Sequence, residues 1–487
     1  MVGGGTIGDG GGIGMGGKAS ASSVLWIRNG TLVTSAGRRA ADIECAAGRI
    51  RSIVPRGGDA AVDPPPQADA SVETIDAAGC YVFPGFMDPH VHAWLPLGGG
   101  LSARSNYANT SRAALSGGTT CFMDFAGSGL EPTLTAAREE WRRRAEGESS
   151  CDYLWHLTVT RWSDAIRDEL ETFVAAGLRS IKIYLAYRPA LAISDADLFS
   201  VLSFAAAHDV VVMAHCENAD LIPALQQRLL EEGKTGPEWH EPSRPPMVEA
   251  EGVTRFLTFA AATGAKAYVV HVSSAESLAA AERFRGRTSA LHLETMPHYL
   301  LLDSSYTARP DFEGAKWVLS PPLRTPADQT ALWAALAEGR IDTLATDHCP
   351  FDFRGQKERG RGDFTRIPNG IAGIEERMPL MLTEALRASP RLSLERLVAV
   401  AAENPAKIFG LYPRKGSLQP GADADVAIWD PNAGEHVLTQ AAQSLDTDYN
   451  PYEGFRVRGR FRAVVARGEI KIRDGRWMGR EGGGKLL

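Results

Sequence analysis

The sequence predicts an α/β protein, a (β/α)8 TIM-like barrel with a small β-sandwich domain formed from both terminal regions. Between residues 83 and 415, short apolar segments typical of strands alternate with helical stretches. This alternation predicts a parallel sheet, and about 330 residues fit an eight-stranded barrel with insertions. Polar residues directly follow several of the apolar segments, as in barrel active sites. A doubly wound open sheet is the alternative, and the placement of these polar residues favours the barrel.

The barrel elements are read from apolar runs and from the helical patterns between them. The expected strands include Thr119–Phe125, Ser180–Tyr184, Val210–Ala214, Ala267–Val272 and Thr343–Thr346. The expected helices include Asp195–His208 and Val248–Thr263.

The two flanks of this central region are rich in short strands and turns. Val24–Ile27 is followed by Asn29-Gly30, a strong hairpin-turn signal, and Asp425–Trp429 is a similar apolar run near the other end. Two such flanks around a long centre predict one accessory domain built from both. The expected division is a flexible tail over 1–23, the β-sandwich domain over 24–82 plus 416–475, the metal-dependent catalytic barrel over 83–415, and a C-terminal tail over 476–487.

Both tails lack the bulky apolar residues that stabilise a fold. Residues 1–23 are rich in Gly, Ser and Ala, so we expect a flexible segment. Gly12, Gly14 and Gly17 match a G-x-G-x-x-G phosphate-binding pattern, but no strand precedes them and no periodic helix follows, so we reject that interpretation. The Gly-rich end of the chain is also expected to be disordered.

Composition excludes several classes of function. The formal charge of −7 and a pI of about 5.9 give no electrostatic reason to bind nucleic acid or an anionic membrane. No apolar stretch has the roughly 20 residues that span a bilayer, and no signal peptide is evident. Six cysteines without a C-x-x-C pair do not form a disulfide framework in so long a chain. We therefore expect a cytoplasmic protein.

The first indication of a functional site is the segment that ends in Asp88-Pro-His90-Val-His92. Alternate residues of a strand share a face, so these three side chains are expected to point the same way. Two imidazoles at this spacing are typical ligands of one metal ion, and histidine nitrogen suits zinc. Asp88 is expected to act as a direct ligand or to orient one. The alternative is a buried strand with incidental histidines.

Three more polar residues directly follow apolar strand candidates: His215, His271 and Asp347. A lone histidine in such a place is usually a hydrogen-bonded structural residue. Together with His90 and His92, however, these residues provide four imidazoles and a carboxylate. That set suffices for two metal ions if one bridging anion is added.

Lys182 is unusual because it lies inside the apolar strand candidate Ser180–Leu185, where a charged ammonium is costly to bury. One interpretation is a lysine that pairs with a carboxylate or extends to solvent. The other is a lysine converted by carbon dioxide to a carbamate, whose two oxygens would bridge two divalent ions.

Much of the central region resembles the cyclic amidohydrolases: dihydropyrimidinases, hydantoinases and, more distantly, allantoinases and dihydroorotases. The matching stretches occur in the family's order. They are Pro84–His92, Ala113–Phe125, Ser180–Tyr187, Met213–Asn218, His271–Ser274, Glu294–Leu300, Ser320–Arg324, Thr346–Phe351 and Ile367–Arg377.

The resemblance implies an enzyme with two divalent metal ions, expected to be Zn²⁺. The implied ligands are His90, His92 and Asp347 for the first ion, His215 and His271 for the second, and carbamylated Lys182 bridging both. It further implies that Asp347 acts as general base and then general acid, and that the Tyr187 hydroxyl binds the developing oxyanion. Backbone groups of Ser320 and Asn369 would hold the ring amide.

The implied reaction is ring opening of a hydantoin or a 5,6-dihydropyrimidine to an N-carbamoyl amino acid. Leu97, Tyr184 and Leu191 are expected to line the pocket for the ring substituent, where the segment Ala93–Asn109 departs most from the family pattern. An allantoinase or another cyclic imide or ureide hydrolase is the alternative. A non-enzymatic scaffold of the same fold is disfavoured because the full ligand set is present. The resemblance also implies a homotetramer or homodimer.

Overall fold

Eight parallel strands form the barrel in this computed structural model, which describes residues 24–56, 72–98 and 100–487. In order of pairing they are β15 (Thr343–Leu344), β14 (Ala290–Thr295), β13 (Lys266–Val269), β12 (Val211–His215), β11 (Ser180–Tyr184), β10 (Asp152–Thr158), β9 (Thr119–Ala126) and β6 (Phe86–Val91). The barrel predicted from the sequence is confirmed.

The ring closes between its first and last strands through side-chain as well as backbone contacts. Val91, at the end of β6, forms a parallel bridge with His348, which follows β15. The carboxylate of Asp88 accepts hydrogen bonds from the Thr346 backbone N–H (3.2 Å) and hydroxyl (2.7 Å). These contacts bring the chain around His90 next to the chain around Asp347.

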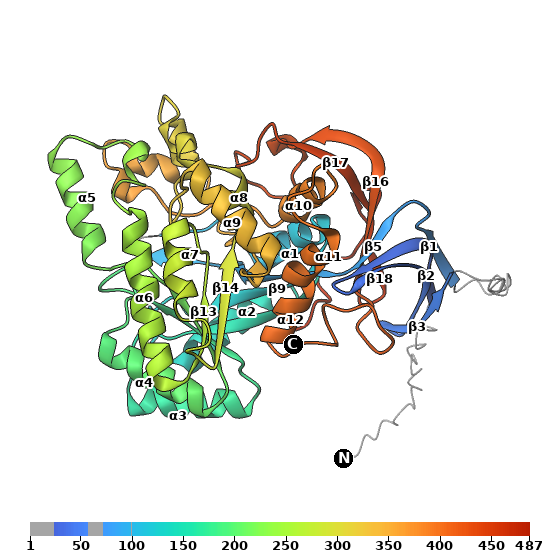
Figure 1. Ribbon diagram of the computed structural model, residues 1–487, viewed down its shortest axis with the longest axis horizontal. Coiled ribbons are helices and arrows are strands. Elements are labelled where there is room, and N and C mark those ends of the chain that lie inside the picture. Colours follow the sequence, from blue (N-terminus) through green and yellow to red (C-terminus); the bar gives the residue numbers. More distant parts are fainter. Residues whose placement is uncertain (1–23, 57–71, 99) are drawn as a thin grey trace, which may run out of the picture.

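Helices cover the outside of the barrel (Figure 1). They are α1 (Tyr107–Ser116), α2 (Leu134–Ala145), α3 (Asp164–Ala175), α4 (Asp195–Ala207), α5 (Leu221–Glu231), α6 (Pro246–Thr263), α7 (Ala275–Glu282), α8 (Pro297–Leu301), α9 (Pro326–Glu338), α10 (Arg377–Ala385), α11 (Leu394–Val398) and α12 (Asn404–Ile408).

Local signals define where these helices begin and end. For α9, Thr325 and Asp328 form a capping box, and Pro326 occupies the first turn, where its missing N–H costs nothing. The helix stops at Gly339, whose φ of 86° is left-handed and suits glycine.

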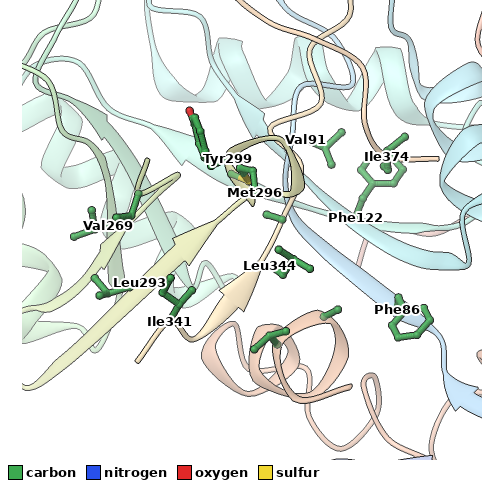
Figure 2. Packing of buried hydrophobic residues seen from close by; sticks show 14 of the residues in the cluster. Phe86, Val91, Phe122, Val269, Leu293, Met296, Tyr299, Ile341, Leu344 and Ile374 are labelled. Atoms are coloured by element: carbon green, nitrogen blue, oxygen red, sulfur yellow. The ribbon is translucent and has the colours of Figure 1, made fainter. Parts of the chain in front are cut away.

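Apolar side chains fill the space between strands and helices (Figure 2). Val269, Leu293 and Leu344 come from three neighbouring strands and pack in the same buried cluster as Phe86 and Phe122 from the other end of the sheet. Burial on both faces explains why these strands read as continuous apolar runs in the sequence. This core fixes the strand ends that carry the polar residues.

Strands from the two flanks form the accessory β domain, which lies at one side of the barrel (Figure 1). They are β1 (Val24–Thr34), β2 (Gly37–Ala46), β3 (Arg49–Pro55), β4 (Val72–Asp76), β5 (Tyr81–Pro84), β16 (Val426–Val437), β17 (Arg456–Ala466), β18 (Glu469–Arg473) and β19 (Arg476–Trp477). Eight of them follow one hydrogen-bonded path, in which β5 pairs with both β1 and β16, and β4 pairs with β1 off that path. Residues from both flanks share one apolar core, so the expected two-flank domain is confirmed.

A buried ionic cluster joins the two domains. The Lys415 ammonium lies 2.6 Å from Asp152, at the start of barrel strand β10, and 3.0 and 2.6 Å from Asp423 and Asp425, which precede β16. All four side chains are buried, so the lysine neutralises carboxylates that would otherwise repel one another.

The end of the chain differs from the expected disordered tail. Leu486 pairs with Tyr153 of β10, and the Lys485 backbone N–H donates to the Asp152 carboxylate at 2.9 Å. Backbone hydrogen bonds to a strand edge hold this segment, a contact that a glycine-rich composition does not reveal. The glycine pattern of residues 12–17 lies outside the described residues. Among the helices of the described ranges, none is both long and apolar enough to cross a membrane.

Candidate active site

A cavity of about 440 Å³ opens at the carboxyl ends of the barrel strands. Every residue to which the family resemblance assigns a role in the site lines it: His90, His92, Leu97, Lys182, Tyr184, Tyr187, Leu191, His215, His271, Ser320, Asp347 and Asn369. These residues are spread over 280 positions of the chain and meet only because parallel strands end at the same rim.

Asp347 lies between the two histidines of the H-x-H segment. Its Oδ1 atom is 3.1 Å from Nε2 of His90 and 3.1 Å from Nε2 of His92. Burial favours the neutral carboxyl, but the two imidazoles hold the pKa of Asp347 well below its usual range. One carboxylate and two imidazoles thus converge with ligand atoms close enough for one metal ion.

His215 and His271 lie beside this first group. The centres of their rings are 4.7 Å apart, and the His271 ring is 5.5 Å from that of His90. The backbone of His271 has a φ of 41°, and that of Asp347 a φ of 50°. Left-handed backbone is strained for residues other than glycine and is found disproportionately at functional sites. The fold therefore keeps both residues in a strained backbone conformation that directs their side chains into the cavity.

Lys182 lies at the base of the same cavity with 1% of its surface exposed. Its Nζ atom is 4.6 Å from the centre of the Phe125 ring and 5.1 Å from that of Tyr184, and among the described residues it makes no ion pair. Burial lowers the pKa of the ammonium to about 8. The interpretation of Lys182 as an ordinary ion-paired lysine therefore lacks a partner.

Two buried glutamates that the sequence interpretation left without a role each orient one histidine. Glu294 Oε1 is 2.7 Å from Nδ1 of His90, and Glu217 Oε2 is 2.7 Å from Nε2 of His215. A carboxylate that holds one ring nitrogen leaves the other for a metal, the usual arrangement at zinc sites. Glu217 lies two residues after His215 in the sequence MAHCEN, and this spacing is the sequence feature that could have indicated its role.

Asp88 has a different position from the histidines that follow it. Its Oδ1 atom accepts the His90 backbone N–H at 3.2 Å, and the carboxylate also binds Thr346. The side chain is fully buried and does not line the cavity. Asp88 therefore holds together the strands that carry His90 and Asp347, and it is not among the side chains that line the cavity.

Tyr187 follows β11 with a φ of 71°, another left-handed residue at this rim. Its ring centre is 5.1 Å from that of His215, and the Arg244 guanidinium lies 5.5 Å from the ring centre. Burial raises the pKa of the hydroxyl to about 12. The hydroxyl therefore stays protonated at neutral pH and can donate a hydrogen bond into the cavity.

The outer wall combines polar backbone with apolar side chains. Ser320 and Asn369 come from two separate loops, and the carbonyl of Val318 accepts the Gly370 N–H at 3.1 Å, which joins those loops. Leu97 and Leu130, exposed by 45% and 67%, stand at the mouth. Leu130 was not expected from the sequence, where nothing marks an isolated leucine between turn residues.

Comparison with known proteins places this arrangement in a family. The family model "Amidohydrolase family" matches residues 81–471. The chain belongs to the amidohydrolase family. This amidohydrolase is 39% identical to the D-hydantoinase of Geobacillus stearothermophilus, with 95% of each chain covered. It is 40% identical to the D-hydantoinase of Ralstonia pickettii, with 95% of this chain and 98% of that one covered.

A solved structure, the D-hydantoinase (dihydropyrimidinase) from a Thermus species, superposes with a TM-score of 0.90 at 43% identity. The superposition covers 95% of this chain and 98% of that one. The amidohydrolase fold therefore extends over the accessory β domain as well as the barrel.

The residues present fit two metal ions. Four imidazoles and one carboxylate converge, two of the imidazoles are oriented by buried glutamates, and Lys182 lines the same cavity without an ion-pair partner among the described residues. Nitrogen and oxygen donors of this kind suit zinc.

Proposed function

We propose that this amidohydrolase opens a cyclic amide ring, that of a hydantoin or a 5,6-dihydropyrimidine, to give an N-carbamoyl amino acid. The observation that carries the proposal is the convergence of the whole predicted ligand set in one cavity that also contains Tyr187. The names of the similar proteins support this substrate class.

In this proposal His90, His92 and Asp347 would hold one Zn²⁺ ion, and His215 and His271 would hold the other. Lys182, as a carbamate, would be a ligand shared by both. When bound, such ions polarise a carbonyl and lower the pKa of water to near neutrality. Carbamylation requires a neutral amine and yields an anion, so it removes the cost of an unpaired buried ammonium at Lys182.

The side chains of the protein have separate roles in proton transfer, oxyanion binding and substrate binding. Asp347, held ionised by its neighbours, takes a proton from the attacking water and delivers it to the leaving ring nitrogen. The protonated Tyr187 hydroxyl donates a hydrogen bond to the developing oxyanion. Backbone groups at Ser320 and Asn369 hold the amide edge of the ring, and Leu97, Tyr184 and Leu191 contact its substituent.

Location and assembly complete the proposal. All six cysteines are buried and unpaired, which suits the reducing cytoplasm. We propose a homotetramer or a homodimer, as the resemblance of the sequence to the cyclic amidohydrolases implies.

The test pairs metal analysis with a substrate panel. The purified protein is loaded with zinc, its metal content is measured, and ring-opening rates are recorded on hydantoin, a 5-substituted hydantoin, dihydrouracil and allantoin. We expect two ions per chain and turnover of a hydantoin or dihydrouracil. Turnover of allantoin alone would keep the mechanism and replace the substrate, whereas two bound ions with no turnover of any ring would refute the proposal.

A further inference from the structure

Lys357 is a second buried lysine, and it lies behind the wall of the cavity rather than in it. It begins the short 3₁₀ helix Lys357–Gly360 and has no exposed surface. Its Nζ atom donates to the carbonyl of Val318 at 2.8 Å and to the carbonyl of Pro368 at 3.0 Å. Among the described residues it makes no ion pair, so these two backbone carbonyls take the place of a carboxylate.

The two carbonyls belong to the two loops that form the polar wall. Val318 lies two residues before Ser320, and Pro368 directly precedes Asn369. The Val318 carbonyl also accepts the Gly370 N–H at 3.1 Å. The Lys357 side chain therefore links both loops, at Val318, two residues before Ser320, and at Pro368, which itself lines the cavity.

A second link between the loops, from the Gly370 N–H to the Val318 carbonyl, does not reach the Pro368 carbonyl that Lys357 binds. At Gly370 the φ is +142°, and an added Cβ would lie 2.5 Å from the Cys349 carbonyl, so the loop already follows a path that only glycine permits. Losing the Lys357 donors would leave the buried Pro368 carbonyl without the partner that it has now, at a cost that the loop would relieve by moving.

We propose that Lys357 is a positioning residue that fixes the distance between the backbone groups of Ser320 and Asn369 and so sets the affinity for the ring amide. The inference rests on the proposed function, because it assigns to that site the device that holds its substrate-binding edges. It predicts that substrate binding depends on Lys357, whereas metal binding does not depend on it.

The experiment compares zinc-loaded wild type, Lys357→Met and Lys357→Gln on the best substrate of the panel. Methionine has nearly the length of lysine but no donor, and glutamine keeps an N–H donor on a shorter arm. We expect Lys357→Met to raise KM by roughly tenfold or more, with kcat and metal content changed much less. The KM of Lys357→Gln should lie between the KM of wild type and that of Lys357→Met. Lys471→Met is the matched control, because Lys471 is also buried but lies in β18, away from the cavity.

A folded Lys357→Met protein with full metal content and a wild-type KM would overturn the inference. If this variant does not fold, Lys357→Gln decides by the same criterion. If wild type opens none of the rings, the proposed function fails, and hydrogen exchange decides separately about Lys357. Faster exchange of the Gly370 amide in the variant than in wild type would then support the tie between the loops, and equal exchange would refute it.

Discussion

Glu217 Oε2 lies 2.7 Å from Nε2 of His215 and at the same time accepts a hydrogen bond from Nη1 of Arg244 at 2.6 Å. The three side chains are buried. Burial disfavours the charged carboxyl, but the Arg244 guanidinium and the His215 imidazole lower the pKa of Glu217 to about 2. A permanently ionised acceptor therefore fixes the orientation of His215.

Replacing Glu217 by Gln should weaken binding of the second metal ion. The amide is neutral and a weaker acceptor, so His215 would lose both its fixed tautomer and part of its basicity. We expect the metal affinity to fall roughly 10- to 100-fold, with activity restored by excess zinc. Metal titration of the apoprotein measures the change.

Glu384→Gln provides the control for this substitution, because Glu384 is also buried but lies on α10, outside the cavity. Equal metal affinity in Glu217→Gln and Glu384→Gln would contradict the role of Glu217.

Removing the Tyr187 hydroxyl should slow the chemical step. Tyr187→Phe keeps the ring and its contact with His215 but loses the donor to the oxyanion. We expect kcat to fall about 100-fold, corresponding to roughly 3 kcal/mol, with metal content unchanged. Tyr184→Phe is the matched control on the same wall, and similar losses in both variants would argue against a specific role for Tyr187.

Lys182 should carry a carbamate when the protein is loaded with metal. Intact mass measured under native conditions should show one added carbon dioxide per chain, lost on acid denaturation. Lys182→Ala should bind the metals poorly and lose turnover, and a small carboxylate such as propionate should restore part of both. A Lys182→Ala protein with two tightly bound ions and wild-type kcat would rule out a bridging role.

Lys415→Met should destabilise the junction between the two domains. It would remove the buried cation that contacts Asp152, Asp423 and Asp425. Arg467 would still pair with Asp152, and Arg49 and Arg414 with Asp423, so Asp425 would be left without an ion-pair partner among the described residues. We expect a loss of about 3 kcal/mol in the free energy of unfolding at pH 7, measured by denaturant titration. Lys407→Met, at an exposed position on α12, should change the stability by less than about 1 kcal/mol.

The same cluster predicts a dependence on pH. Burial opposes ionisation of Asp423, but the adjacent Lys415 ammonium lowers the pKa of this carboxyl below its ordinary value. A carboxyl whose pKa is lower in the folded state stabilises the protein above its unfolded pKa, and that contribution is lost as pH falls below about 4. The stability difference between wild type and Lys415→Met should therefore shrink as the pH is lowered from 5 to about 3. A constant difference over that range would contradict this account.

The sequence by itself determined the type of fold and predicted the residues that line the cavity. Continuous apolar runs such as the strand before His215 mark strands buried on both faces, and a polar residue directly after such a run marks a strand end. The five strands predicted from these runs all form, although β13 and β15 end before the predicted limits at Val272 and Thr346. Those polar endings turn inward through left-handed backbone at His271 and Asp347, which sequence propensity does not predict.

Tertiary structure alone decided how those residues are held. Glu294 and Lys357 are ordinary charged residues in the sequence, and each acquires its role from a partner that another strand or loop brings within hydrogen-bond distance. Glu217 is close to His215 in the sequence, but Arg244, which helps to hold it ionised, comes from a separate segment. Asp88 follows the same principle, since its carboxylate accepts two hydrogen bonds from Thr346, a residue far along the chain. Spacing along one strand predicts which side chains can meet. Which buried charge is neutralised by which partner depends on contacts between segments far apart in the chain, and only the folded barrel fixes those.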